Sequence, residues 1–377
     1  MKKLTAFLLC IVLLAQSAFA ASPAESARDL ALSAVSGQKN LAGVSGELLS
    51  LGEEFPAGTS ICDWTAIAIA LLGAPDDTAA YLAAENEYIS EHFPAPASGR
   101  APYATDWQRA ALTVRALGGD PTACGTDGKV NLIAGGTYDF AGKSLGMQGL
   151  NGWIFALIAL DCGAYEVPEG SRYTRGDILA EILAAQEPDG GFGLVPGSSD
   201  PDITAMALQA IAPYAGNEAA DAAEKAVAFL ANAMTEDALF IYGDKPSAES
   251  SAQVIIALCA LGIDPAEDER FAKNGTNIVD ALTDTYRRAD GSYAHTPADE
   301  TGDFMATEQV MLAFTALWKL RSGAGRLYDM TAAPAQSAPE SGASSSRLPL
   351  ILGGAAALIV IAAVIGIAAR KKKEKKA

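Results

Sequence analysis

The 377-residue chain contains few of the residue types that build the commoner kinds of functional site. Only two histidines are present, His92 and His295, which excludes a histidine-rich metal site. Five cysteines are too few for a disulfide-stabilised scaffold of this length. The 27 basic side chains face 45 acidic ones, and this balance excludes a basic surface for nucleic acid. Aromatic residues make up 7% of the chain, which leaves few rings to stabilise a carbocation.

The two ends of the chain have the composition of export and anchoring signals. Residues 1–20 combine two lysines, an apolar stretch and an Ala-Phe-Ala cleavage site, which predicts a signal peptide. Residues 348–369 are apolar and long enough to span a bilayer as a helix, and residues 370–377 are basic, which predicts one transmembrane helix with a cytoplasmic tail. Residues 329–347 are rich in Ala, Pro and Ser and are predicted to form a flexible linker. This organisation predicts a cell-surface protein whose extracellular domain, residues 21–328, is held at the membrane by its C-terminal helix.

The net charge of the whole chain conceals a more acidic middle. Residues 1–20 contribute +2 and residues 370–377 contribute +5 to the net charge of −18, so the segment between them carries −25. A domain of that charge stays soluble and is repelled by anionic membrane surfaces.

A repeat of about fifty residues runs through the predicted extracellular domain. Six apolar helical segments end at similar points: Leu72, Leu117, Leu160, Ile211, Leu261 and Leu317. Each is apolar on nearly all sides, which predicts a buried inner helix. The intervening segments 175–186 and 220–234 are amphipathic, which predicts outer helices. We therefore predict an all-α domain of six helical hairpins that close into a ring, because an open array would need a polar cap at each end.

Two loops between helices share a motif of a turn followed by an aromatic residue, Gln186–Gly193 and Arg288–Tyr293. The Asp-Gly pair suits the turn, and the aromatic side chain is expected to pack back against the helices. The first loop, together with residues 202–205 (Asp-Ile-Thr-Ala), resembles the repeats of protein prenyltransferases and squalene cyclases. The resemblance covers residues 25–325 and implies an α6/α6 toroid whose central cavity is lined by loops and inner-helix starts. Cobalamin carriers and tailed surface proteins of Gram-positive bacteria have similar toroids.

The resemblance also implies two kinds of chemistry. In squalene cyclases an acid at the position of Asp202 protonates an alkene, but Ile203 stands where their motif has a further carboxylate. Asp202 is also explained as the N-cap of an inner helix. Prenyltransferases bind zinc through Asp, Cys and His, but Ala306 replaces the expected histidine and Cys259 lies deep within a helix. We therefore predict neither a metal nor a cofactor.

Two further sets of residues leave alternatives open. A glycoside-acting barrel would need two carboxylates about 5–10 Å apart. The carboxylates at predicted inner-helix starts are Asp63, Asp106, Asp202, Glu249 and Glu308, but helix N-termini favour acidic residues in any case, so no pair stands out. The cysteines beyond the signal peptide are Cys62, Cys124, Cys162 and Cys259, and they predict either two disulfides or free buried thiols.

Aromatic and polar residues near the inner-helix starts are the candidate ligand-binding residues. They are Asp63, Trp64, Asp106, Trp107, Arg109, Trp153, Asp202, Thr204, Gln253 and Gln309. Such a mixture at a concave mouth suits a small molecule, although tryptophans also suit packing between hairpins. We predict a membrane-anchored toroid that binds a small molecule or surface ligand without catalysis. The alternatives are a terpenoid cyclase or prenyltransferase-like enzyme that uses Asp202, a cobalamin-carrier-like protein, and a structural surface protein without a small ligand.

Overall fold

The computed structural model describes residues 22–93 and 102–332. The predicted signal peptide, transmembrane helix, basic tail and most of the linker lie outside the described residues. In the part that is described, no helix is both long and apolar enough to cross a membrane.

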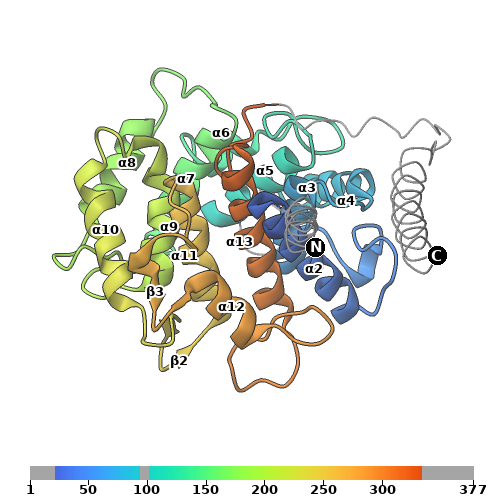
Figure 1. The fold of residues 1–377 in the computed structure, drawn as a ribbon. Helices are drawn as coiled ribbons and strands as arrows, with labels where there is room; N and C mark the ends of the chain where they lie inside the picture. The colour runs from blue at the N-terminus through green and yellow to red at the C-terminus, as the bar shows by residue number, and fades with distance from the viewer. Residues whose placement is uncertain (1–21, 94–101, 333–377) are drawn as a thin grey trace, which may run out of the picture. The chain divides into compact units, whose positions relative to one another are not determined.

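Six helices form an inner ring in which each packs against the next and the last packs against the first (Figure 1). They are α3 (Ser60–Leu72), α5 (Ala104–Ala116), α7 (Asn151–Cys162), α9 (Pro201–Ile211), α11 (Ala248–Ala260) and α13 (Phe304–Ser322). These are the apolar segments of the sequence repeat. Inner neighbours flank each of them and an outer helix lies behind, so only the side toward the ring axis remains open. This explains why their sequences are apolar nearly all round.

Six outer helices pack against the inner ring. They are α2 (Pro23–Leu41), α4 (Thr78–His92), α6 (Leu132–Gly136), α8 (Arg175–Ala184), α10 (Ala220–Ala233) and α12 (Ile278–Tyr286). Short 3₁₀ helices occur at Gly52–Glu54, Ala212–Tyr214 and Glu269–Phe271. The predicted amphipathic pattern is confirmed in α10, where Ala226 and Leu230 are buried while Asp221 and Lys225 are exposed.

The first and last hairpins of the described domain meet where the ring closes. Helix α2 lies along α13, so the two ends of the domain are side by side (Figure 1). A glycine permits the closest approach, because a Cβ atom at Gly37 would lie 2.3 Å from the backbone of Gly291 and Ser292. The loop of the second Asp-Gly motif therefore rests directly on the first helix.

Two short antiparallel hairpins depart from the all-α prediction. Strand β1 (Ile241–Tyr242) pairs with β2 (Lys245–Pro246), and β3 (Ala272–Lys273) pairs with β4 (Thr276–Asn277). In the second hairpin Asn274 and Gly275 have positive φ angles of 53° and 85°, the conformation that an Asn-Gly turn favours. Each strand is only two residues long, so the described domain remains mostly helical.

The chain continues beyond α13 as a segment, residues 324–330, that crosses the ring where the inner helices end. The Met330 backbone N–H donates to the Cys162 carbonyl over 2.8 Å, and the Arg115 guanidinium donates to the Met330 carbonyl. The Lys319 ammonium donates to the Leu327 carbonyl over 3.0 Å. Because Leu327 and Met330 are buried, the packed domain extends two residues past the predicted boundary at residue 328.

All four cysteines of the described residues are free and buried: Cys62, Cys124, Cys162 and Cys259. Of the two alternatives that the sequence left open, the structure therefore has the free thiols. They lie within a core made largely of Ala, Leu and Ile.

Candidate functional site: the central cavity

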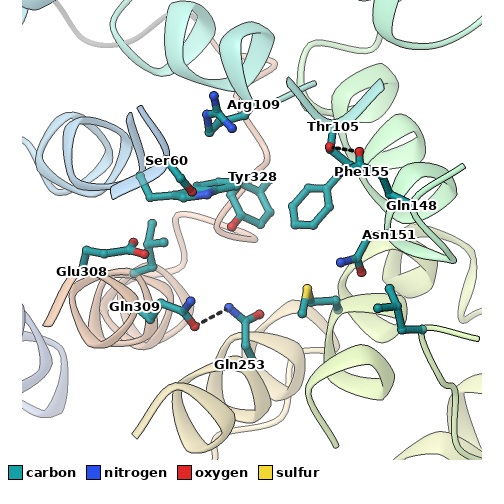
Figure 2. A pocket seen from close by; sticks show the side chains of 14 residues that line it. Ser60, Thr105, Arg109, Gln148, Asn151, Phe155, Gln253, Glu308, Gln309 and Tyr328 are labelled. Carbon is teal, nitrogen blue, oxygen red and sulfur yellow. Dashed lines mark hydrogen bonds between the residues drawn. The ribbon is translucent and has the colours of Figure 1, made fainter. Parts of the chain in front are cut away.

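The inner helices surround a cavity of about 420 Å³ and contribute side chains from their first turns (Figure 2). Three of them each supply two side chains spaced four residues apart, which places both on one face of a helix. The pairs are Ser60 and Trp64, Thr105 and Arg109, and Asn151 and Phe155. The other three inner helices contribute Met206, Gln253, Glu308, Gln309 and Leu312, and the segments outside the inner helices contribute Gln148, Leu194 and Tyr328. Trp64, Arg109, Gln253 and Gln309 each lie eight residues before the end of their apolar segment, so four repeats contribute equivalent positions to the cavity.

A tyrosine from the C-terminal segment forms part of this cavity wall. Tyr328 follows α13 in sequence, and its side chain lines the cavity (Figure 2). Its ring centroid lies 6.3 Å from that of Trp64, which in turn lies 5.7 Å from that of Phe155. Three aromatic side chains from distant parts of the chain thus gather around one space.

A second lobe of about 450 Å³ adjoins the first. The two lobes share Asn151, Leu194, Met206, Gln253 and Gln309. The second lobe adds Asp202, Glu249 and His295 from inner-helix starts and loops, and the exposed Tyr242 and Met305. It is therefore the entrance side of the same site.

Asp202 is a buried carboxyl group in the entrance lobe. Its Oδ1 atom has no hydrogen-bond partner within the described part of the chain. Burial raises the pKa of Asp202 to about 6, and the neighbouring Asp200 and Glu249 act in the same direction. The N-cap role suggested for Asp202 is wrong, because the Asp200 side chain accepts the N–H groups of residues 202 and 203 at the start of α9. Asp202 thus remains available to a ligand.

Glu249 and His295 form a pair at the same entrance. The His295 Nδ1 atom lies 2.8 and 2.9 Å from the two Glu249 carboxylate oxygens. This hydrogen bond raises the pKa of His295, while burial raises the pKa of Glu249. The pair fixes the orientation of the imidazole ring, whose side chain is half exposed.

Glu308 is the most buried carboxyl group of the cavity lining. It is 1% exposed, and its Oε2 atom lacks a hydrogen-bond partner in the described structure. Burial raises the pKa of Glu308 well above its ordinary value, and the acidic Glu249 and Asp303 raise it further. Its surroundings therefore favour the neutral carboxylic acid over the carboxylate.

Arg109 extends from α5 into the cavity lining, and its positive charge is paired with two aspartates. Its Nε atom lies 2.8 Å from Asp63 Oδ2, and its Nη1 atom lies 3.7 Å from Asp106 Oδ1. Asp63 also accepts from the Tyr81 hydroxyl and the Gly58 N–H. Asp63 and Asp106 therefore lie behind Arg109 and orient it.

Three glutamines connect adjacent inner helices. The Gln209 amide donates to Gln253 Oε1 over 2.8 Å, and the Gln253 amide donates to Gln309 Oε1 over 3.0 Å (Figure 2). Nearby, the buried Asn151 Oδ1 has no partner in the described residues. This side of the cavity thus presents amide groups suited to hydrogen bonding.

Half of the candidate residues chosen from the sequence line the two lobes: Trp64, Arg109, Asp202, Gln253 and Gln309. The others lie off the cavity: Asp63, Asp106, Trp107, Trp153 and Thr204. Trp107 packs against Phe93 with a centroid separation of 4.6 Å, Trp153 packs against Tyr173, and the Thr204 hydroxyl hydrogen-bonds the backbone of Phe192.

The tryptophans diverge because the Asp-Trp pairs are not equivalent positions. Trp64 and Trp107 are 43 residues apart, whereas the ends of their helices, Leu72 and Leu117, are 45 apart. A difference of two residues rotates a side chain by about 200° around a helix. Trp64 therefore faces the cavity and Trp107 faces away from it, and the residue equivalent to Trp64 is Arg109.

Several lining residues were not chosen from the sequence: Ser60, Thr105, Asn151, Phe155, His295 and Tyr328. Ser60 and Thr105 lie twelve residues before Leu72 and Leu117, so aligning the inner helices on their final Leu or Ile would have paired these two, whereas Asn151 and Phe155 lie at other offsets from Leu160. No local pattern marks Tyr328 or His295. The described residues contain no group of three or more His, Cys, Asp or Glu side chains that would hold a metal ion.

No family profile and no curated protein sequence matches the chain. Solved structures are similar in fold. Protein geranylgeranyltransferase-I from Candida albicans, in complex with GGPP, has a TM-score of 0.50 and 12% identity, over 69% of this chain and 83% of that chain. A type II terpene cyclase from Scytonema, in complex with geranylgeranyl dihydroxybenzoate, has a TM-score of 0.46 and 12% identity, over 78% of this chain and 99% of that chain. With a TM-score below 0.5, this second structure supports no inference about fold or function.

The likeness to the geranylgeranyltransferase and the closed ring of inner helices place the chain in one fold class. It is an α/α toroid, the fold that the resemblance drawn from the repeats implied. At 12% identity the likeness is one of fold. It transfers neither an isoprenoid substrate nor a metal to this chain.

Proposed function

We propose that the toroid binds a small organic molecule in its central cavity. The observation that carries the proposal is the lining, which combines the amide groups of Gln253, Gln309 and Asn151 with the rings of Trp64 and Phe155. The two lobes, about 420 and 450 Å³, are in the range of small-molecule sites. Rings provide apolar contact and amides provide orientation, which together suit a ligand with both an apolar face and polar groups.

Thermal stabilisation of the full-length chain in a neutral detergent tests this proposal. The ligand panel contains organic cations, oligosaccharides, isoprenoid diphosphates and corrinoids. A ligand at 100 times its Kd stabilises the folded state by about 2.7 kcal/mol. Stabilisation by corrinoids alone would favour a cobalamin-carrier-like function.

A matched pair of variants locates the binding. Ser60→Trp fills the cavity, whereas Asp284→Trp adds the same side chain at an exposed position of α12. We expect the first to abolish ligand stabilisation and the second to preserve it. If no class of ligand stabilises the chain, or if stabilisation survives Ser60→Trp, the proposal is wrong.

One observation favours a second function, acid catalysis by Asp202. A carboxyl group with a pKa of about 6 keeps its proton to higher pH than an ordinary aspartate and is placed at the entrance lobe. If the chain is such an enzyme, Asp202→Asn should abolish turnover of an unsaturated ligand while leaving its binding within about threefold. A binding protein would show no turnover in either form.

We further propose that the toroid is displayed outside a membrane by the predicted helix at residues 348–369. The signal-like residues 1–20 and the basic residues 370–377 support this topology. In cells that express the full-length chain, external protease should remove the toroid and leave a C-terminal tag protected. A toroid that is protected until the cells are lysed would contradict the topology.

A further inference from the structure

We infer that the ligand of the central cavity carries an organic ammonium group, which Glu308 receives in a cavity that the rings of Trp64, Phe155 and Tyr328 also line. This inference rests on the proposed binding function and specifies the chemical class of the ligand. It starts from a single unusual group, the buried carboxyl of Glu308.

Glu308 lacks the partner that a buried acid normally has. One of its oxygens is buried without a hydrogen-bond donor, although the side chain lines a cavity. A buried carboxyl group is costly unless it is paired. A ligand that brings a positive charge to this carboxyl group would remove this cost.

The charges around Glu308 favour a cation over an anion. Those that act on its carboxyl are Glu249 from α11 and Asp303 just before α13, and both are acidic. Helices α2 and α3 also pack against α13, but none of their charged side chains is among those that shift the pKa of Glu308. Among the described lining residues, Arg109 is paired with two aspartates, and His295 is paired with Glu249. Near Glu308 the cavity is therefore negative, as is the segment around it.

The aromatic side chains next to Glu308 suit the same ligand. Tyr328 is close enough for the charge of Glu308 to raise the pKa of its phenol, after the larger effect of burial. The Trp64 ring lies within 6.3 Å of both the Tyr328 and Phe155 rings, measured between centroids. Aromatic faces attract ammonium groups, most strongly when both are shielded from water. A cavity lined by a carboxyl group and three rings thus offers both charge pairing and cation–π contact to one ligand.

Binding of such a ligand has a defined proton balance. The neutral Glu308 carboxyl loses its proton to the solvent, and the resulting carboxylate pairs with the ammonium group of the ligand. One proton is released for each ligand bound, as long as the pH lies below the raised pKa of Glu308. A neutral ligand would leave the proton in place.

Isothermal titration calorimetry of the full-length chain tests the inference with isosteric pairs of probes. Choline is compared with 3,3-dimethyl-1-butanol, and benzylamine with benzyl alcohol. We expect the charged member of a pair to bind about tenfold more tightly or better, equivalent to about 1.4 kcal/mol. Titrations over a range of pH in two buffers with different ionisation enthalpies should show proton release on binding of the charged ligand, and this release should disappear once the pH exceeds the folded-state pKa of Glu308.

Glu308→Gln should remove both the preference for the charged probe and the proton release. Glu224→Gln, an exposed position on α10, is the matched control and should change neither. Trp64→Leu should weaken the charged probe more than its neutral isostere, and Trp64→Phe should restore most of the difference.

The outcomes separate this inference from the proposed function. If the neutral isosteres bind as tightly as the charged probes, or if oligosaccharides bind and ammonium compounds do not, the inference is wrong while the binding function stands. If charged probes bind equally to wild type and Glu308→Gln, the site lies elsewhere and the inference is also wrong. If nothing in either panel binds, both proposals fail.

Discussion

Glu308 shows how one residue can lower stability for the sake of a site. A glutamine of nearly the same shape would fill its place without an ionisable group, yet the chain buries a carboxyl there with an unpartnered oxygen. Positions that break a local rule of this kind are characteristic of functional sites.

The first prediction concerns the pH dependence of this position. As pH rises above 4.5, the ordinary value, an unfolded chain releases the Glu308 proton whereas the folded chain retains it. Folding stability is therefore lost as pH rises toward the folded-state pKa. We expect Glu308→Gln and wild type to be nearly equal in stability at pH 4, and the variant to gain on wild type by about 1.4 kcal/mol for each pH unit above 4.5 until the folded-state pKa is reached.

Thermal unfolding of the full-length chain at pH 4 and pH 7 measures this difference. The exposed Glu224→Gln variant controls for the change in net charge. A stability gain that is the same at pH 4 and pH 7 would show that ionisation of Glu308 is not its cause.

At the scale of elements, the two Asp-Gly loops are attached to the next inner helix in the same way. The Phe192 N–H donates to Thr204 Oγ1 over 2.8 Å, and the Tyr293 N–H donates to Thr307 Oγ1 over 2.9 Å. Phe192 and Tyr293 are fully buried, as expected from the sequence. Each threonine therefore satisfies a backbone donor that would otherwise be buried without a partner.

The second prediction is that Thr204→Val and Thr307→Val each destabilise the toroid by about 1–3 kcal/mol, because each leaves a buried N–H unsatisfied. Thr315→Val is the matched control. That threonine is equally buried, but its hydroxyl only donates to the Met311 carbonyl of its own helix. Urea unfolding should show a much smaller loss in the free energy of unfolding for Thr315→Val than for the other two variants. Equal losses in all three variants would refute the proposed role of these loop contacts.

At the scale of the whole molecule, the C-terminal segment ties the ends of several inner helices together. Its carbonyls and amides bind Arg115 of α5, Cys162 of α7 and Lys319 of α13. Lys319 is 7% exposed, and burial lowers its pKa to about 8, with Arg326 acting in the same direction and Asp329 opposing it. This segment also carries Tyr328, so the same residues that bind the helix ends supply part of the cavity wall.

The third prediction follows from this lysine. Between pH 8 and 10.5 the unfolded chain keeps a proton on Lys319 that the folded chain has released, so the lysine adds stability as pH rises through this window. Lys319→Met removes that gain and also leaves two carbonyls without their donor. The variant should be destabilised at pH 7 by about 1–3 kcal/mol, and by more at pH 10.

Unfolding of wild type and Lys319→Met at the two pH values tests this expectation. Lys225→Met, at an exposed position of α10, should behave like wild type at both. A difference between Lys319→Met and wild type that shrinks toward pH 10 would contradict the assigned pKa shift.

Much of the ring could be predicted because local periodicity reports burial. Segments such as Val254–Leu261 are apolar on every side only if neighbours surround them, whereas Arg175–Ala184 has one apolar face, so inner and outer helices are distinguishable from sequence. The site was predicted less well. Asp-Trp pairs that look equivalent in sequence point in different directions, because their registers relative to the helix ends differ by two residues.

The sequence by itself determined which helices are inner and which are outer, and that first turns of the inner helices carry the polar groups. These properties depend on spacing along one helix. Only the tertiary structure decided that Tyr328 lies beside Trp64, that Arg109 is paired while Glu308 is not, and that His295 meets Glu249. Each of these contacts joins residues that are far apart in sequence. Such contacts are determined only when the helices pack into a closed ring, with α13 against α2 and α3.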